Sequence, residues 1–151
     1  MIDGLEIRHL EPRADERGRL MTLFRAREEG LPTFGQVHVT AVYPGVVKGW
    51  HRHRRTTDVF CCVQGMVRLG LYDDREGSKT GGELNEFYLG IHHPLRILVP
   101  PGIWFGFKGL GTEEALVVVY TDTPYDPQDP DQETMDPEVN EIPFDWSLRD
   151  R

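Results

Sequence analysis

The chain has 151 residues, a formal net charge of −8, 38% hydrophobic residues and 28% charged residues. This composition is typical of one soluble globular domain that buries a sizeable core, and so acidic a chain is not expected to bind nucleic acid. No apolar run reaches the roughly 20 residues of a membrane span, so no membrane partner is expected. The first residues lack the basic and apolar regions of a signal peptide, which predicts a cytoplasmic protein.

The predicted elements are short strands separated by turns that contain glycine and proline. Periodicity is weak over residues 1–31, where we expect a short strand at Leu20–Phe24 and a short helical piece near Arg25–Glu29. The β signal strengthens afterwards, with a hairpin turn at Gly65 and a charged loop over Asp73–Gly82. The further strands expected are Val37–Tyr43, Val59–Val63, Val67–Leu71, Glu86–Leu89, Arg96–Val99, Trp104–Phe107 and Ala115–Thr121.

Many short strands at fairly regular spacing predict an all-β fold, a single sandwich or barrel domain over residues 1–151. The acidic tail over residues 123–151 contains much of the proline and is expected to be irregular. Ile142, Phe144 and Trp146 are apolar anchors in this tail, so we expect it to pack on the barrel. Cys61 and Cys62 are adjacent and would face opposite sides of a strand, which predicts free thiols in a reducing compartment.

Two histidines, His51 and His53, stand two residues apart before an apolar strand. Residues i and i+2 of a strand project from the same face, so both imidazoles point the same way. Inside a barrel they are either a proton-transfer pair or two metal ligands. Basic residues surround the pair and suit a small anionic ligand, although any one of them could belong to a solvated charged loop. These residues are Lys48, Arg52, Arg54 and Arg55.

The segment Gly45–Gly65 fits the first cupin motif, G-x5-H-x-H-x4-E-x6-G, at every spacing, with Asp58 in the glutamate position. The second cupin motif is half present, because Phe105 occupies the place of its histidine. The resemblance implies a cupin-type β-barrel or jelly roll. A metal site of His51, His53 and Asp58 stays open as an alternative, because imidazole and carboxylate groups suit several divalent metals.

Further motifs occur in an order that resembles the dTDP-4-dehydrorhamnose 3,5-epimerase family, a branch of the cupins. The resemblance implies an isomerase that removes a proton next to the ketone of a dTDP-linked 4-keto-6-deoxy sugar, in deoxysugar or surface-polysaccharide biosynthesis. It also implies a homodimer, and we expect no cofactor. The matching segments are Asp15–Gly18, Gln36, Val46–His51, Val99–Phe107, Thr121–Tyr125, Met135–Pro137 and Asp145–Trp146.

Carried over by position, His51 matches the catalytic base of the family and Asp136 the carboxylate that orients it. A carboxylate behind an imidazole fixes its tautomer and stabilises the imidazolium that forms. Arg17 and Lys48 match positions that contact the nucleotide diphosphate. The other candidate substrate-binding residues are Gln36 and Tyr125.

Three positions depart from the family. Asp58 replaces a lysine near the developing enolate, where a carboxylate would oppose the negative charge. Val118 replaces the tyrosine that acts as the acid, with Tyr120 and Tyr125 nearby in sequence. Phe105 replaces a histidine.

The segment His51-Arg52-His53 also resembles the histidine pair of the dTDP-sugar 3,4-ketoisomerases, which makes His53 a second catalytic candidate. The proline-glycine turn at Pro100–Gly102 and the tail are closer to the epimerases. A ketoisomerase, a metal-binding cupin and a non-catalytic sugar-nucleotide binder remain the alternatives. The remaining histidines are expected at the surface or in the core; they are His9, His38, His92 and His93.

Overall fold

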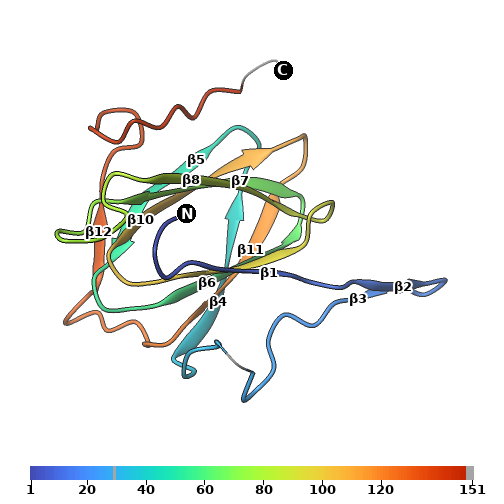
Figure 1. Cartoon of the computed structure of the whole chain (residues 1–151). Helices are drawn as coiled ribbons and strands as arrows, with labels where there is room; N and C mark the ends of the chain where they lie inside the picture. Colours follow the sequence, from blue (N-terminus) through green and yellow to red (C-terminus); the bar gives the residue numbers. More distant parts are fainter. Residues whose placement is uncertain (29, 149–151) are drawn as a thin grey trace.

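A computed structural model of the chain describes residues 1–28 and 30–148. Within these residues the protein consists of twelve strands and connecting loops, without a helix. Two five-stranded antiparallel sheets pack face to face as a β-sandwich (Figure 1). The predicted all-β fold is therefore confirmed. No helix in the described ranges could cross a membrane.

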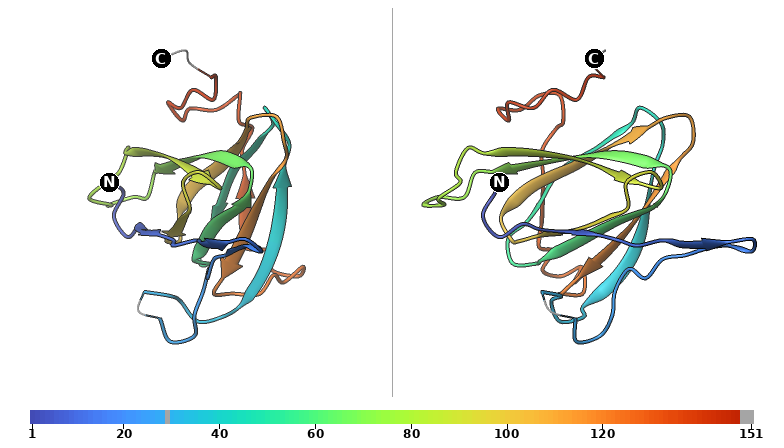
Figure 2. Two further views of the ribbon diagram at one scale, coloured as in Figure 1. Left: turned by 90° about the vertical axis from the view of Figure 1, so that its right-hand side faces the viewer. Right: turned by 45° about the vertical axis from the view of Figure 1, so that its right-hand side comes forward.

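In each sheet the strands lie side by side in an order that differs from their order in the sequence. The first sheet has the order β1-β9-β6-β11-β4, with the bounds Glu6–His9, Leu95–Val99, Asp58–Gln64, Ala115–Thr121 and Gln36–Val42. The second sheet has the order β12-β5-β10-β7-β8, with the bounds Gln132–Thr134, Val47–His53, Ile103–Leu110, Met66–Asp73 and Leu84–Gly90. A separate hairpin of β2 (Arg13–Asp15) and β3 (Gly18–Leu20) projects away from the sandwich (Figures 1 and 2).

The main core lies between the two sheets and is built by the alternation of side chains along each strand. Inward-facing residues of β6, β7, β10 and β11 are almost completely excluded from water. Burial of this apolar surface is the main force that holds the sheets together. Representative members are Phe60, Leu69, Leu71, Phe107, Val117 and Val119.

A second apolar cluster covers the outer face of the second sheet. Trp50 of β5 is fully buried, and its ring lies 5.0 Å from the ring of Trp146 and 5.4 Å from that of Phe144. The C-terminal segment that carries these two residues runs over the outside of β5, β7 and β8 (Figures 1 and 2). Ile142 is also buried in this cluster. The tail therefore packs on the sandwich, and it contributes one strand, β12, that its sequence did not indicate.

The structure corrects two local predictions near the N-terminus. The strand expected at Leu20–Phe24 ends at Leu20, because the hairpin strand β3 covers Gly18–Leu20. The helical piece near Arg25–Glu29 is a turn over residues 26–27, in which the Glu28 N–H donates to the Arg25 carbonyl over 3.2 Å; Glu29 itself lies outside the described residues. Strands β1 and β2 were not predicted, because most of their residues are exposed and lack an apolar pattern.

Candidate active site

A cavity of about 790 Å³ opens at one end of the sandwich, between the edge strand β4 and the strands β5 and β12. Its floor is apolar and includes Phe60, Phe105, Phe107 and Val119, whereas its walls are polar. The polar lining residues are Gln36, His38, Thr40, Lys48, His51, His53, Arg55, Thr56, Asp58, Thr121, Thr123, Tyr125, Asp126, Asp129, Asp131 and Gln132.

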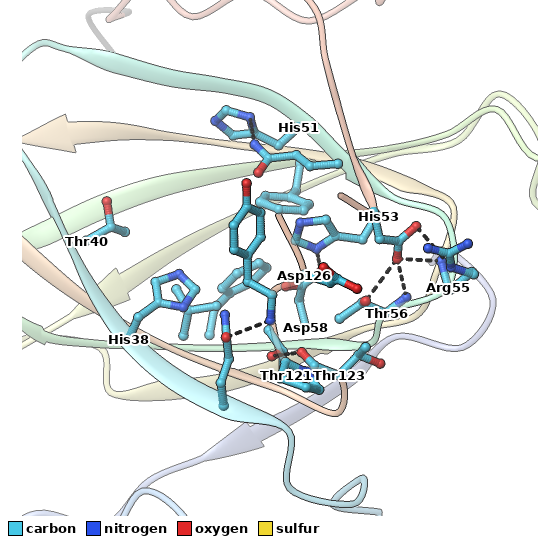
Figure 3. Close-up of a pocket in the computed structure, with 18 of the residues that line it drawn as sticks. His38, Thr40, His51, His53, Arg55, Thr56, Asp58, Thr121, Thr123 and Asp126 are labelled. Atoms are coloured by element: carbon cyan, nitrogen blue, oxygen red, sulfur yellow. Dashed lines mark hydrogen bonds and ion pairs between the residues drawn. The ribbon is translucent and has the colours of Figure 1, made fainter. Parts of the chain in front are cut away.

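Strand alternation decides which residues of β4 face this cavity. Gln36, His38 and Thr40 line it, whereas Val37 and Val39 point outward with 52% and 58% of their surface exposed. Figure 3 shows His38 and Thr40 on the side of the pocket opposite His51 and His53. His38 is exposed, as expected of a surface histidine, and it also lines the pocket.

His53 forms a close pair with Asp58 inside the pocket. The His53 Nδ1 atom lies 2.7 Å from Asp58 Oδ2, and Asp58 is only 2% exposed (Figure 3). Burial lowers the pKa of His53, but the hydrogen bond to Asp58 and the charges of Asp58 and Asp131 outweigh burial, so the pKa is raised. Burial also raises the pKa of Asp58, an effect that His53 partly offsets. The hydrogen bond between Nδ1 and the carboxylate therefore favours the protonated form of His53.

His51 has a different partner. Its Nδ1 atom lies 3.0 Å from the side-chain amide nitrogen of Gln132, a neutral group. Burial lowers the pKa of His51, and the positive charges of His53 and Lys48 lower it further. His51 is therefore a neutral imidazole at pH 7, which is the form that accepts a proton. The Phe105 ring lies 5.9 Å from the ring of His51 and 5.7 Å from that of His53, so it packs against both imidazoles.

The segment before β12 forms one wall of the pocket and is fixed by Asp131. Its carboxylate accepts hydrogen bonds from the backbone N–H groups of Arg54, Arg55 and Thr56 and from the Thr56 hydroxyl. These bonds outweigh the effect of burial and hold the pKa of Asp131 below its usual range. β12 then pairs with β5, and this pairing brings Gln132 to His51.

The basic residues around the histidines do not form the open basic mouth that the sequence suggested. Arg52 and Arg54 both pair with Glu133, and Arg55 lies 2.9 Å from Asp129. Lys48 points its Nζ atom at the Thr40 hydroxyl and the Ala41 carbonyl instead. Among these four cations, only Lys48 has no carboxylate partner in the described parts of the chain.

Two predicted site residues lie outside the pocket. The Asp136 side chain is exposed and accepts the backbone N–H groups of Glu138 and Val139 within the tail. The place behind His51 is taken by Gln132, four residues earlier. Arg17 lies on the projecting β2–β3 hairpin and pairs with Asp15 at 2.5 Å. Neither residue lines the cavity.

The structure distinguishes the candidate tyrosines. Val119 and Thr121 of β11 face the pocket, so the intervening alternation points Val118 to the other side of the sheet. A side chain at position 118 therefore does not reach the pocket. The hydroxyl of Tyr120 donates to the Pro32 carbonyl at 2.7 Å, away from the pocket. Tyr125 lines the pocket, and its backbone N–H donates to the side-chain oxygen of Gln36 at 2.8 Å.

The donor geometry does not support the metal alternative. Asp58 directs Oδ2 at Nδ1 of His53 rather than at a point shared with His51. Within residues 1–28 and 30–148, no group of three histidine, cysteine, aspartate or glutamate side chains is arranged to hold a metal ion.

Sequence reasoning missed Gln132, Asp131 and the partnership of His53 with Asp58. The sequence singled out Asp58 as a possible metal ligand and as the replacement of a lysine, but it did not pair Asp58 with His53. Gln132 and Asp131 lie some 75 to 81 residues from their partners in the chain, and only the pairing of β12 with β5 brings them there.

The fold and the pocket together define a class of protein. It is a two-sheet barrel of the cupin type with a cavity between its sheets, and one neutral and one carboxylate-paired histidine line that cavity. Such an arrangement is suited to proton transfer.

Comparison with known proteins identifies the family within this class. The sequence profile of the dTDP-4-dehydrorhamnose 3,5-epimerase family matches residues 1–151, and the chain belongs to that family. It is 39% identical over 148 residues to a probable low-salt glycan biosynthesis epimerase of Haloferax volcanii, covering 97% of this chain and 95% of the relative. It is 34% identical over 151 residues to the spore coat polysaccharide biosynthesis protein SpsL of Bacillus subtilis, covering 100% of both chains.

Solved structures agree with this assignment. A crystal structure of a dTDP sugar isomerase from Desulfovibrio desulfuricans G20 superposes with a TM-score of 0.92 at 31% identity, covering 99% of this chain and 94% of the other. NovW, a 4-keto-6-deoxy sugar epimerase from Streptomyces spheroides, superposes with a TM-score of 0.84 at 26% identity, covering 97% of this chain and 76% of the other.

Proposed function

We propose that the protein is an epimerase that acts on a dTDP-linked 4-keto-6-deoxy sugar in the biosynthesis of a polysaccharide or glycan. The observation that carries this proposal is the neutral His51 in the pocket of a chain that belongs to the epimerase family. The probable glycan biosynthesis epimerase and the dTDP sugar isomerase among its relatives support the substrate class.

The reaction begins at a carbon next to the ketone. His51 takes the proton from that carbon, and the electron pair moves toward the C4 oxygen to form an enolate. Tyr125 supplies a phenol in the same pocket and is our candidate for returning a proton to the opposite face. His51 and Tyr125 then exchange protons with water, which restores the starting protonation states.

Binding of the nucleotide part depends on the cationic groups of the pocket. Lys48, whose charge no carboxylate neutralises in the described residues, is our candidate for the diphosphate. Gln36 positions the backbone of Tyr125 and lies on the same wall. His51 and His53 hold the sugar between β4 and β5.

We also propose that the protein works as a homodimer. β4 is an unpaired sheet edge with exposed Val37 and Val39, and the β2–β3 hairpin projects beyond the sandwich (Figure 1). A second copy would cover this edge, and Arg17 on the hairpin would then reach the pocket of that copy. Sedimentation should give a dimer at micromolar concentration, and a stable monomer there would contradict this assembly.

Deuterium incorporation tests the proposed activity. The protein is incubated with dTDP-4-keto-6-deoxyglucose in deuterated water, and the product is analysed by NMR. Deuterium at C3 or C5 with inverted configuration is expected. Movement of the carbonyl to C3 would replace the epimerase with a ketoisomerase, an alternative that the presence of both His51 and His53 in the pocket favours. A folded protein that binds dTDP without either change would be a non-catalytic binder.

The proposed compartment is the cytoplasm. Cys61 and Cys62 are both free and buried, and burial raises the pKa of their thiols to about 12 and about 11. Unpaired, unreactive cysteines of this kind fit a reducing compartment.

A further inference from the structure

The negative charge of Asp58 alone would oppose an enolate, but Asp58 is paired with His53, which changes its effect on the reaction. We propose that His53, held as an imidazolium by Asp58, donates its free N–H to the C4 oxygen of the sugar and stabilises the enolate, with Asp58 as its positioning residue. This inference rests on the proposed epimerase function and deepens it.

The first support is the geometry of the pair. Asp58 is 2% exposed, and its second oxygen, Oδ1, is buried without a hydrogen-bond partner among the described residues. His53 is therefore its one close charge partner, at 2.7 Å. A buried carboxylate with a single partner makes the loss of that partner's proton costly. The pair is neutral as a unit, so Asp58 does not oppose an enolate; it leaves the Nε2 N–H of His53 available to the pocket.

The second support is that the other cations of the pocket are engaged. Lys48 contacts the Thr40 hydroxyl over 2.7 Å and the Ala41 carbonyl over 3.0 Å. Arg55 is neutralised by Asp129 and lies 3.7 Å from Asp131. His53 is thus the pocket group that carries a proton and has its second nitrogen uncommitted in the described structure.

The third support is the contrast between the two histidines. The groups that face His53 are Asp58 from β6, Asp131 from the segment before β12, His51 from its own strand and His38 from β4. Burial lowers the pKa of His53, but the hydrogen bond to Asp58 and the charges of the two carboxylates outweigh burial, so the pKa is raised. The pKa of His51 is lowered by burial, by His53 and by Lys48. Two neighbouring histidines whose pKa values are shifted in opposite directions can serve as an acid and a base.

The step balances with these two groups. The C–H bond next to the ketone breaks and its proton moves to His51. The electron pair of that bond forms a carbon–carbon double bond, and the C4 carbonyl becomes an oxyanion. The Nε2 N–H of His53 donates a hydrogen bond to that oxygen and keeps its proton throughout. When the carbon regains a proton, the carbonyl re-forms and His53 returns to its starting state.

The first experiment needs no variant and no substrate. The histidine side chains of the ¹⁵N-labelled protein are titrated by NMR between pH 5 and 10. His53 should stay protonated at both ring nitrogens at pH 7.5, where His51 is neutral. A neutral His53 at pH 7.5 would overturn the inference whatever the activity is.

The second experiment uses deuterium exchange with dTDP-4-keto-6-deoxyglucose. His53→Gln should lower kcat by about 10²–10³-fold, the usual cost of losing an oxyanion donor, while the KM changes much less. Asp58→Asn should lose more activity at pH 8.5 than at pH 6, because the imidazole then deprotonates at a lower pH. His93→Gln is the matched control; this exposed histidine bonds the Tyr88 carbonyl far from the cavity and should leave the rate unchanged.

The outcomes separate this inference from the proposed function. If the wild-type protein shows no exchange, the epimerase function fails. If the wild type exchanges but His53→Gln is as active, only the role of His53 fails. A loss in Asp58→Asn that is equal at pH 6 and pH 8.5 would mean that Asp58 is structural and would overturn its positioning role. Bound dTDP and a cooperative unfolding transition establish that the variants are folded.

Discussion

Two buried carboxylates of this protein, Asp73 and Asp58, are equally hidden from water but are supported differently. Asp73 is 0% exposed at the end of β7, where it binds Arg75 through two nitrogens and accepts the hydroxyls of Ser78 and Thr80. Both of its oxygens are satisfied. Asp58 is 2% exposed in the pocket and has one partner for one oxygen.

The pKa values of the two groups follow from this difference. Burial acts to raise the pKa of Asp73, but its several hydrogen bonds hold it well below the usual range. The pKa of Asp58 stays raised because a single imidazole offsets burial only in part. Asp73, whose oxygens are fully hydrogen-bonded, stabilises a loop. Asp58 favours the protonated form of His53. The comparison therefore predicts that pocket substitutions change the rate and that substitutions at Asp73 change the stability.

The largest effect is expected at the base. His51→Asn should lower the rate of deuterium exchange by about 10²–10⁴-fold, because it removes the general base. The midpoint of thermal unfolding should stay close to that of the wild type. Exchange that persists within a few fold of the wild-type rate would remove His51 from the mechanism.

The second prediction concerns the saturated carboxylate. Asp73→Ala should lower the free energy of unfolding by roughly 3 kcal/mol, since Arg75, Ser78 and Thr80 all lose a charged acceptor. Urea unfolding measures this loss, and the specific activity of the folded fraction should not change. Asp15→Ala, at an exposed pair with Arg17, is the control that should leave the stability unaltered. Similar stabilities of both variants would contradict the structural role of Asp73.

A smaller effect separates Gln132 from Asp136. Gln132→Leu removes the partner of His51 and should slow exchange about 10-fold, a typical cost of disturbing the orientation of a catalytic group. Asp136→Asn should change the rate by less than about 2-fold, because its carboxylate only accepts backbone N–H groups of the tail. The reverse order of the two effects would support the assignment that family resemblance alone suggests. Steady-state kinetics at a single pH is sufficient.

The smallest effect is the pH dependence of stability, which should have opposite signs for the two groups. Asp73 has a lowered pKa in the folded state, so its contribution is present above its unfolded pKa of about 4 and is lost as the pH falls below it. His53 has a raised pKa, so its contribution is present below about pH 6.5 and is lost as the pH rises through the folded value. Urea unfolding between pH 3 and 9 should show the acid slope weakened in Asp73→Asn and the alkaline slope weakened in His53→Gln.

The fold and part of the site could be predicted from the sequence. Regular glycine-punctuated strands predicted the all-β architecture, since alternation along a strand is a local property. The spacing of His51 and His53 likewise placed both in one pocket. Asp136 was placed behind His51 by its position in a family motif, whereas the register of β12 on β5 brings Gln132 there. That register is set by contacts between distant segments, and no local pattern reveals it.

The aromatic cluster on the outer face of the second sheet makes two glycines matter far from any ligand. A methyl group at Gly70 would lie 2.9 Å from Phe144 and 3.0 Å from Trp50, and one at Gly106 would lie 3.0 Å from Trp146. Since Trp50 precedes His51 and bonds Met135 just after β12, the rings, the base and the pocket wall share one support. Alanine at either glycine would therefore displace the C-terminal segment. It would also weaken the packing that supports the strand carrying His51.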